Sequence, residues 1–211
     1  MRKSKFKADL SKEELLSKYL DEFYLKKFDD SEYSIQRENG LDLQYRGVDL
    51  TLYDNNNKFY VDEKAQLDYI NNSLPTFAFE LSYLKDNQWR KGWLFDKTKI
   101  TDVYFLVTNI YTNISNDLSS GLSHIKITGI YRDKLIKLLH VKGLTEFVLF
   151  DLENKIRKFG KHGKVELKKL DPKFEGQLYY SKNNKNEQPI NLVLKLDFLT
   201  ENKTGKIIFS F

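Results

Sequence analysis

Two aspartates and one lysine are the residues of this sequence best suited to catalysis. Asp49 and Asp62 stand on either side of an Asn-rich stretch, 54–57, and Lys64 follows two residues after the second aspartate. Carboxylates are ligands that Mg²⁺ and Mn²⁺ prefer, and such ions keep coordination positions for water and substrate phosphate. A metal held in this way polarises a phosphoryl oxygen and activates water, while a nearby lysine stabilises developing charge. The three residues therefore predict hydrolysis of phosphodiesters.

The β-hairpin expected to carry the two aspartates is predicted from a change in periodicity. Apolar and polar residues alternate over 47–52 and again over 59–65. If 54–57 is the loop of an antiparallel hairpin, facing residues have numbers that sum to 111. Asp49 then faces Asp62, and like charges so placed are destabilising unless a cation compensates them. A divalent metal would supply that charge.

The two-residue period of a strand divides the side chains of the second hairpin strand between two faces. Lys64 and Gln66 are expected on the face of Asp62. The apolar face holds the intervening residues, Val61, Glu63 and Ala65. Glu63 offers a competing alignment, but its side chain falls on that apolar face, so Asp62 is kept as the ligand and Glu63 is expected to give its backbone carbonyl. Gly47 falls opposite Lys64 and would leave space there for a substrate backbone.

The same residues also have a purely structural interpretation. Acidic residues at strand ends are usually solvated, and an exposed strand lysine more often protects the edge of a sheet. The predicted register and the shared face favour the metal site over this alternative.

These features resemble the PD-(D/E)XK nuclease superfamily, which includes type II restriction enzymes, recombination nucleases and junction resolvases. The parts that match are a helix, Gly-Val-Asp at 47–49, a loop, Val-Asp-Glu-Lys at 61–64 and a further strand. The resemblance covers roughly residues 11–108, and Gly-Val stands where the family name has a proline. It implies a Mg²⁺- or Mn²⁺-dependent endonuclease that cuts DNA, with duplex DNA as the leading substrate and a homodimer as the expected assembly. A restriction, phage or mobile-element setting is implied as well.

The resemblance also assigns roles to individual residues. Asp49 and Asp62 would bind the metal, Lys64 would assist the attacking water, and Gln66 matches a supporting glutamine of some family branches. A helical glutamate found in some members has two matches between which the sequence does not choose, Glu14 and Glu22.

Further candidates lie later in the chain. Glu80 is a charge within an apolar run, and buried carboxylates are usually paired or metal-bound, which makes it a secondary candidate. Rings and cations are combined over 89–93 as on single-stranded nucleic-acid surfaces, although a loop tryptophan more often packs on the core. A basic run over 155–173 either clamps phosphates or is a solvated loop. The residues predicted to bind nucleic acid are Arg90, Lys91, Lys158, Lys161 and Lys164.

Periodicity and capping signals predict the elements around these residues. Helices are expected over 11–28, with Ser11 as N-cap, and over 131–141, with Gly143 after its end. Besides the hairpin, strands are expected over 76–83, 102–108, 146–150 and 190–196. The predicted class is α/β (α+β), with a central mixed β-sheet flanked by helices and a restriction-endonuclease-like core. One domain is expected over 1–211, with a core of about 11–145 and a C-terminal elaboration of about 146–211.

Composition narrows the chemistry. The chain has no cysteine, which excludes disulfides, zinc–thiolate sites and thiol nucleophiles, and its three histidines lack metal-ligand spacing. The net charge of +5 is compatible with a polyanionic partner. No apolar stretch approaches the roughly 18 residues of a membrane span, so a cytoplasmic protein without a membrane partner is expected.

Two other functions remain open at this level. The chain could be a nucleic-acid-binding protein that keeps the nuclease fold without turnover, or a nuclease directed at RNA. The intact set of Asp49, Asp62 and Lys64 argues against the first. A titration that finds no Mg²⁺ or Mn²⁺ binding dependent on the two aspartates would favour it, and a comparison of DNA with RNA cleavage decides the second.

Overall fold

The computed structural model describes residues 3–28, 32–183 and 186–211. The described chain is an α+β protein that divides into two compact units. Unit 1 comprises the described parts of Met1–Leu74, together with Thr101–Gly129 and Ile207–Phe211, and unit 2 comprises Pro75–Ile100 and the described parts of Ile130–Lys206. In the described parts of the chain, no helix is long and apolar enough to cross a membrane.

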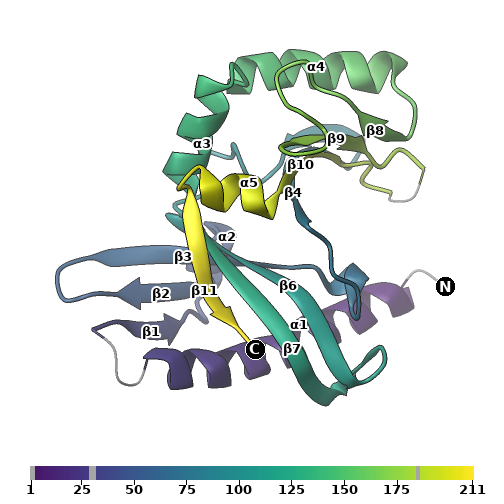
Figure 1. The fold of residues 1–211 in the computed structure, drawn as a ribbon. Helices are drawn as coiled ribbons and strands as arrows, with labels where there is room; N and C mark the ends of the chain where they lie inside the picture. The colour runs from purple at the N-terminus through teal and green to yellow at the C-terminus, as the bar shows by residue number, and fades with distance from the viewer. Residues whose placement is uncertain (1–2, 29–31, 184–185) are drawn as a thin grey trace. The chain divides into compact units, whose positions relative to one another are not determined.

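Unit 1 is built on a six-stranded sheet in the order β1-β2-β3-β6-β7-β11 (Figure 1). The sheet is mixed, because β3 is antiparallel to β2 and parallel to β6. Its elements are α1 (Lys3–Phe28), β1 (Ser34–Arg37), α2 (Leu41–Tyr45), β2 (Leu50–Tyr53), β3 (Lys58–Ala65), the 3-10 turn η1 (Leu67–Tyr69), β6 (Val103–Ile114), β7 (Asp117–Tyr131) and β11 (Gly205–Ser210). The mixed sheet and the buried β6 confirm the predicted class at this level.

Helix α1 packs on the sheet through residues at helical spacing. Leu16, Leu20 and Tyr24 are buried at intervals of four, and the ring of Tyr24 lies 5.8 Å from that of Phe105 on β6. The end at Phe28 is as predicted, but the helix begins at Lys3. Ser11 therefore lies inside the helix, and its prediction as N-cap was wrong, because nothing in the preceding residues breaks a helix.

The hairpin of β2 and β3 has the predicted loop. Asp54 closes that loop, since its Oδ1 accepts hydrogen bonds from the backbone N–H groups of Asn56 and Asn57 at 2.9 and 2.6 Å. This local arrangement is the Asx turn that aspartate favours. It fixes the loop length, and the loop length fixes the register of the strands.

Unit 2 is built on a five-stranded sheet in the order β5-β4-β10-β9-β8 (Figure 1). Its elements are β4 (Thr76–Lys85), β5 (Gln88–Lys91), α3 (Arg132–Val141), α4 (Glu146–Phe159), β8 (Gly163–Val165), β9 (Gly176–Tyr180), β10 (Ile190–Lys195) and α5 (Leu196–Glu201). The predictions of β4, β10 and α3 are confirmed to within a few residues, and Gly143 has the expected positive φ of 73° after α3.

The strand predicted over 146–150 was wrong, because these residues begin helix α4. Thr145 caps this helix by accepting a hydrogen bond from the N–H of Val148 at 3.3 Å. Leu149, Glu153 and Ile156 then form its buried stripe. The first residues of the basic run also belong to α4, so 155–159 are helical and not a loop.

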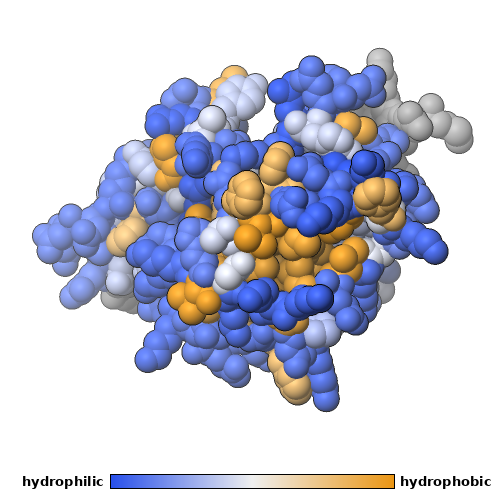
Figure 2. Space-filling view, turned by 90° about the horizontal axis from the view of Figure 1, so that it is seen from above, coloured by the Kyte–Doolittle hydropathy of each residue, from blue (hydrophilic) through white to orange (hydrophobic). Residues whose placement is uncertain are grey.

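Several large apolar side chains are exposed, and Figure 2 shows a face on which apolar residues gather among hydrophilic ones. Helix α4 carries four exposed apolar residues, Phe147, Val148, Phe150 and Phe159. Exposure of this kind is more typical of a contact surface than of a fully solvated helix.

The predicted division of the chain differs from the two units. Residues 75–100 and 130–145 of the predicted core belong to unit 2, and 207–211 of the predicted elaboration belong to unit 1. That all of this acts as one nuclease domain stays a prediction.

Candidate active site

The hairpin register places Asp49 beside Asp62. The pairs Leu50 with Val61 and Leu52 with Phe59 sum to 111, as predicted. Asp49 directly precedes β2 and continues this pairing, because its N–H donates to the carbonyl of Val61 at 2.9 Å. Its carboxylate Oδ2 accepts the N–H of Glu63 at 2.8 Å, so the side chain is held against β3.

Asp62 is the most deeply buried acid of this group, with 2% of its surface exposed. Burial raises the pKa of its carboxyl to about 7, against the opposing charge of Lys64. Asp49 raises that pKa further, both by its charge and by a side-chain hydrogen bond. The two carboxyl groups are therefore close neighbours, as the hairpin register requires.

Lys64 lies on the same face and pairs with Asp62. Its Nζ donates to Oδ1 of Asp62, and 30% of the lysine side chain is exposed. The ammonium is thus accessible to solvent while the carboxyl group beneath it is not. The structure brings all three predicted residues together on one strand face.

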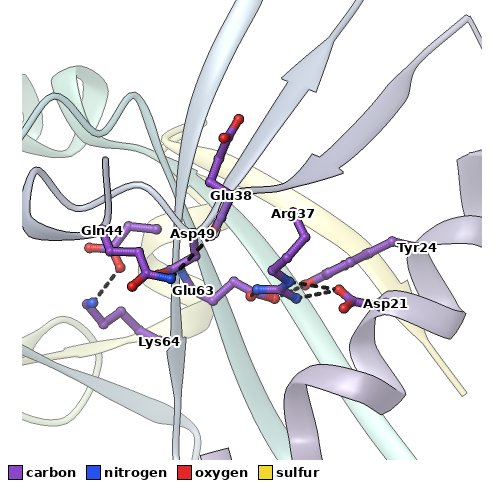
Figure 3. Close-up of polar contacts among 9 residues, drawn as sticks. Asp21, Tyr24, Arg37, Glu38, Gln44, Asp49, Glu63 and Lys64 are labelled. Atoms are coloured by element: carbon purple, nitrogen blue, oxygen red, sulfur yellow. Dashed lines mark hydrogen bonds and ion pairs between the residues drawn. The ribbon is translucent and has the colours of Figure 1, made fainter. Parts of the chain in front are cut away.

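Glu63 points to the other side of β3, toward α1 (Figure 3). Its Oε1 accepts from the hydroxyl of Tyr24 at 2.6 Å, and its Oε2 pairs with Arg37, which also binds Asp21 at 2.5 Å. Burial raises the pKa of the Glu63 carboxyl, and Arg37 lowers it in part. The face was predicted correctly, but its surroundings are not purely apolar, because a polar network joins α1, β1 and β3.

That network was missed by sequence reasoning. Asp21, Tyr24 and Arg37 are 42, 39 and 26 positions from Glu63. The only local signal was a carboxylate on an otherwise apolar strand face, which requires a buried partner. The sequence contains no indication of which cation supplies it.

Gly47 and Gln66 both lie at the end of the hairpin away from its loop, since Gly47 precedes β2 and Gln66 follows β3. Gly47 lies outside β2, in a turn after α2, with φ of 75° and its carbonyl accepting from Oγ1 of Thr101 at 2.6 Å. The expected strand pairing of Gly47 with Lys64 was therefore wrong, because the strand pairs of β2 with β3 begin at Leu50. Gln66 directly follows β3, and its N–H donates to the carbonyl of Val107 on β6 at 3.0 Å.

The remaining carboxylate candidates lie elsewhere. Glu14 and Glu22 are exposed on α1. Glu80 lies on β4 of unit 2, where burial alternates along the strand, and its own side chain is only half-buried. The deeply buried acid of unit 2 is Glu153 on α4, at 5% exposure, which the sequence reasoning did not select.

The basic candidates all belong to unit 2 and are all exposed. Arg90 and Lys91 lie on β5, at one edge of the five-stranded sheet, and Lys164 lies on β8, at the other edge. Lys158 is near the end of α4, and Lys161 follows it. They are therefore distributed over the unit and do not form a single cluster along one strand.

The residues of the candidate site fit a divalent cation that keeps much of its water. Asp49 and Asp62 supply two neighbouring carboxylates, and no group of three or more His, Cys, Asp or Glu suited to a metal occurs among the residues that the structure describes. Mg²⁺ is commonly bound through one or two carboxylates, with water and substrate phosphate completing its shell. The mutual repulsion of the two acids is also what a cation would relieve.

Comparison of the chain with protein-family models, with curated proteins and with solved structures found no match. The function is therefore argued from the residues and contacts described above.

Proposed function

We propose that this protein is a metal-dependent endonuclease that hydrolyses DNA phosphodiester bonds. The observation that carries the proposal is the placement of Asp49 and Asp62 side by side across the hairpin, with Lys64 on the same face. Two acids and one lysine are the groups that metal-assisted attack of water on a phosphodiester requires.

The order of the elements supports the resemblance to PD-(D/E)XK nucleases. Helix α1 precedes the β2–β3 hairpin, and β6 then pairs with β3 as the further strand. Residues Val61 and Asp62 pair with Val103 and Tyr104 of that strand, so the metal-binding strand lies inside the sheet. A restriction-endonuclease-like core is part of the proposal.

Each residue has a distinct role in this mechanism. Asp49 and Asp62 would hold Mg²⁺ or Mn²⁺, with the carbonyl of Glu63 as a third oxygen and Gln66 in support. The bound metal would polarise the phosphoryl oxygen and lower the pKa of a water molecule. Lys64 would orient the attacking water or stabilise charge on the phosphate.

Plasmid cleavage in Mg²⁺ or Mn²⁺ tests the proposal, with Asp62→Asn as the decisive variant. We expect a loss of at least about 100-fold in rate, because losing a ligand should cost at least as much as losing an outer-shell partner, about 10–100-fold. Asp133→Asn makes the same change at an exposed position on α3 and should stay within about twofold of wild type.

The same assay separates the related functions. Wild-type protein that binds nucleic acid but neither cuts it nor binds Mn²⁺ through Asp49 and Asp62 would be an inert binding protein, and cleavage of RNA alone would show an RNA-directed nuclease. Duplex DNA as substrate and a homodimer as the active assembly are proposals that rest on the family resemblance.

A further inference from the structure

Trp89 is an exposed aromatic residue on the edge strand of unit 2. All four residues of β5 are exposed, and Trp89 keeps 41% of its surface accessible. β5 pairs with β4 on one side and has no other strand neighbour in the described sheet. An exposed ring on such a strand is open to a partner, whereas native edge strands are commonly protected by charged side chains, proline or bulges.

The guanidinium of Arg157 on α4 lies against this indole. Its central carbon is 4.3 Å from the centre of the Trp89 ring, a close cation–π contact. Strand pairing puts Lys91 opposite Ser82 and Trp89 opposite Leu84, so these residues share the face toward α4. One face of the indole therefore contacts a positively charged group.

Arg157 is itself held in place by buried partners. It donates to Oε2 of Glu153 at 2.8 Å and to the hydroxyl of Ser82, which in turn donates to the same carboxylate. Glu153 and Ser82 are each 5% exposed. Within the described chain the buried Nε of Arg157 has no hydrogen-bond partner.

Two cations follow the ring along the strand. Arg90 and Lys91 follow Trp89 directly and project from opposite faces of β5. Lys91 pairs with Glu146, yet half of its side chain remains exposed. A phosphate backbone that runs along the edge of β5 past the indole would meet Lys91 on the face of the ring and Arg90 on the opposite face of the strand.

We propose that Trp89 is a stacking platform for the bases of single-stranded nucleic acid. Arg157 fixes the ring from beneath, and Arg90 and Lys91 contact the phosphates. Stacking on a rigid aromatic ring with cations around it binds single strands without reading their sequence. This site lies in unit 2 and does not depend on the metal-binding residues of unit 1.

Fluorescence of a single-tryptophan protein tests the proposal. The chain has two tryptophans, so Trp93→Phe leaves Trp89 as the sole indole. In EDTA, where a metal-dependent nuclease is idle, oligo(dT) and oligo(rU) are titrated into this variant. We expect quenching of Trp89 by both, and by an abasic oligonucleotide of equal length much less, because phosphates alone cannot stack.

The affinities of variants of the full chain for oligo(dT) then measure how much the Trp89 ring contributes to binding. Trp89→Ala should weaken oligo(dT) binding by about 5- to 150-fold, the contribution of one stacked base, while Trp89→Tyr should keep most of the affinity. Trp93→Phe, which alters an indole packed on Phe79, should change it less than about twofold.

Equal binding by wild type and Trp89→Ala would overturn the proposal, and so would equal affinity for the abasic strand. Because the measurement needs no metal and no cleavage, its failure leaves the proposed nuclease untouched. Failure of the nuclease proposal likewise leaves this binding site standing.

Discussion

The carboxyl group of Asp62 is buried between a cation and another acid. Burial disfavours its charged form, Lys64 stabilises that form, and Asp49 opposes it. The balance raises the pKa of Asp62 to about 7. A divalent cation bound by both acids would remove the repulsion and displace the proton, so we expect metal binding to tighten as pH rises.

This raised pKa predicts how stability depends on pH without metal. The folded protein binds more protons than the unfolded chain between about pH 4 and 7, so Asp62 makes stability fall as pH rises through that range. A shift from 3.8 to about 7 corresponds to up to about 4 kcal/mol. Asp62→Asn should remove this fall, as measured by urea unfolding in EDTA from pH 4.5 to 8.

Other acids titrate in the same range, so the difference between wild type and Asp62→Asn is the quantity to examine. Asp133→Asn, with a side chain 64% exposed, should follow the wild-type curve. Parallel curves for wild type and Asp62→Asn would mean that Asp62 is ionised at ordinary pH. Burial and the charge of Asp49 would then not raise its pKa.

At the scale of elements, a buried ion network connects α1, β1 and β3 directly behind the candidate site. Glu63 accepts a hydrogen bond from Tyr24 and forms an ion pair with Arg37, which also binds Asp21. Because the N–H of Glu63 in turn holds the Asp49 carboxylate, the network fixes the strand that carries the site. Its role is positioning, since these side chains point away from Asp62.

The network predicts a large cost for removing its cation. Arg37→Leu leaves Glu63 with only 10% of its side chain exposed and no counter-charge, and breaking a buried pair in this way costs about 3–5 kcal/mol. Urea unfolding at pH 8 measures this loss in the free energy of unfolding. Adding Glu63→Gln to Arg37→Leu should restore much of the loss, because the glutamine still accepts from Tyr24 and carries no charge.

Arg46→Leu, at an exposed position after α2, serves as the comparison and should change stability by less than about 0.5 kcal/mol. If Arg37→Leu were equally mild, or if Glu63→Gln gave no rescue, the network would not hold β3 in place.

Elements determined by local signals could be predicted from the sequence, and the others could not. The hairpin register follows from an Asx turn formed by Asp54 and its neighbours, so it was predictable to the residue. Residues 146–150 formed a short apolar run that fits a strand or a helix equally, and the cap at Thr145 decides between them only in the folded chain. The start of α1 was missed because Ser11 has the residue type of a cap without being one.

At the scale of the whole molecule, the chain passes between the two units several times. Residues 75–100 leave unit 1 for unit 2, and 207–211 return to add β11 to the unit 1 sheet. Such interleaving depends on contacts between distant residues, and no linker or change of composition marks it. The domain boundaries were therefore beyond sequence reasoning.

In the candidate site, too, contacts between residues close in sequence could be predicted, and contacts between distant residues could not. Asp49, Asp62 and Lys64 lie within 16 residues on one hairpin, so periodicity alone placed them together. The Arg37 network behind them and the Trp89–Arg157 contact of unit 2 join residues far apart in sequence, and patterns of single residues do not reveal such pairs.

Plasmid cleavage by two lysine variants of β3 tests the central claim most directly. Lys58 and Lys64 project from the same face of this strand, but Lys58 lies at its start, over the ring of Tyr60 at 4.6 Å, and Lys64 pairs with Asp62. With Mg²⁺ or Mn²⁺, Lys64→Ala should cut at least about 100-fold more slowly than wild type, and Lys58→Ala within about twofold. Equal cleavage by all three proteins, or none by wild type, would contradict the account.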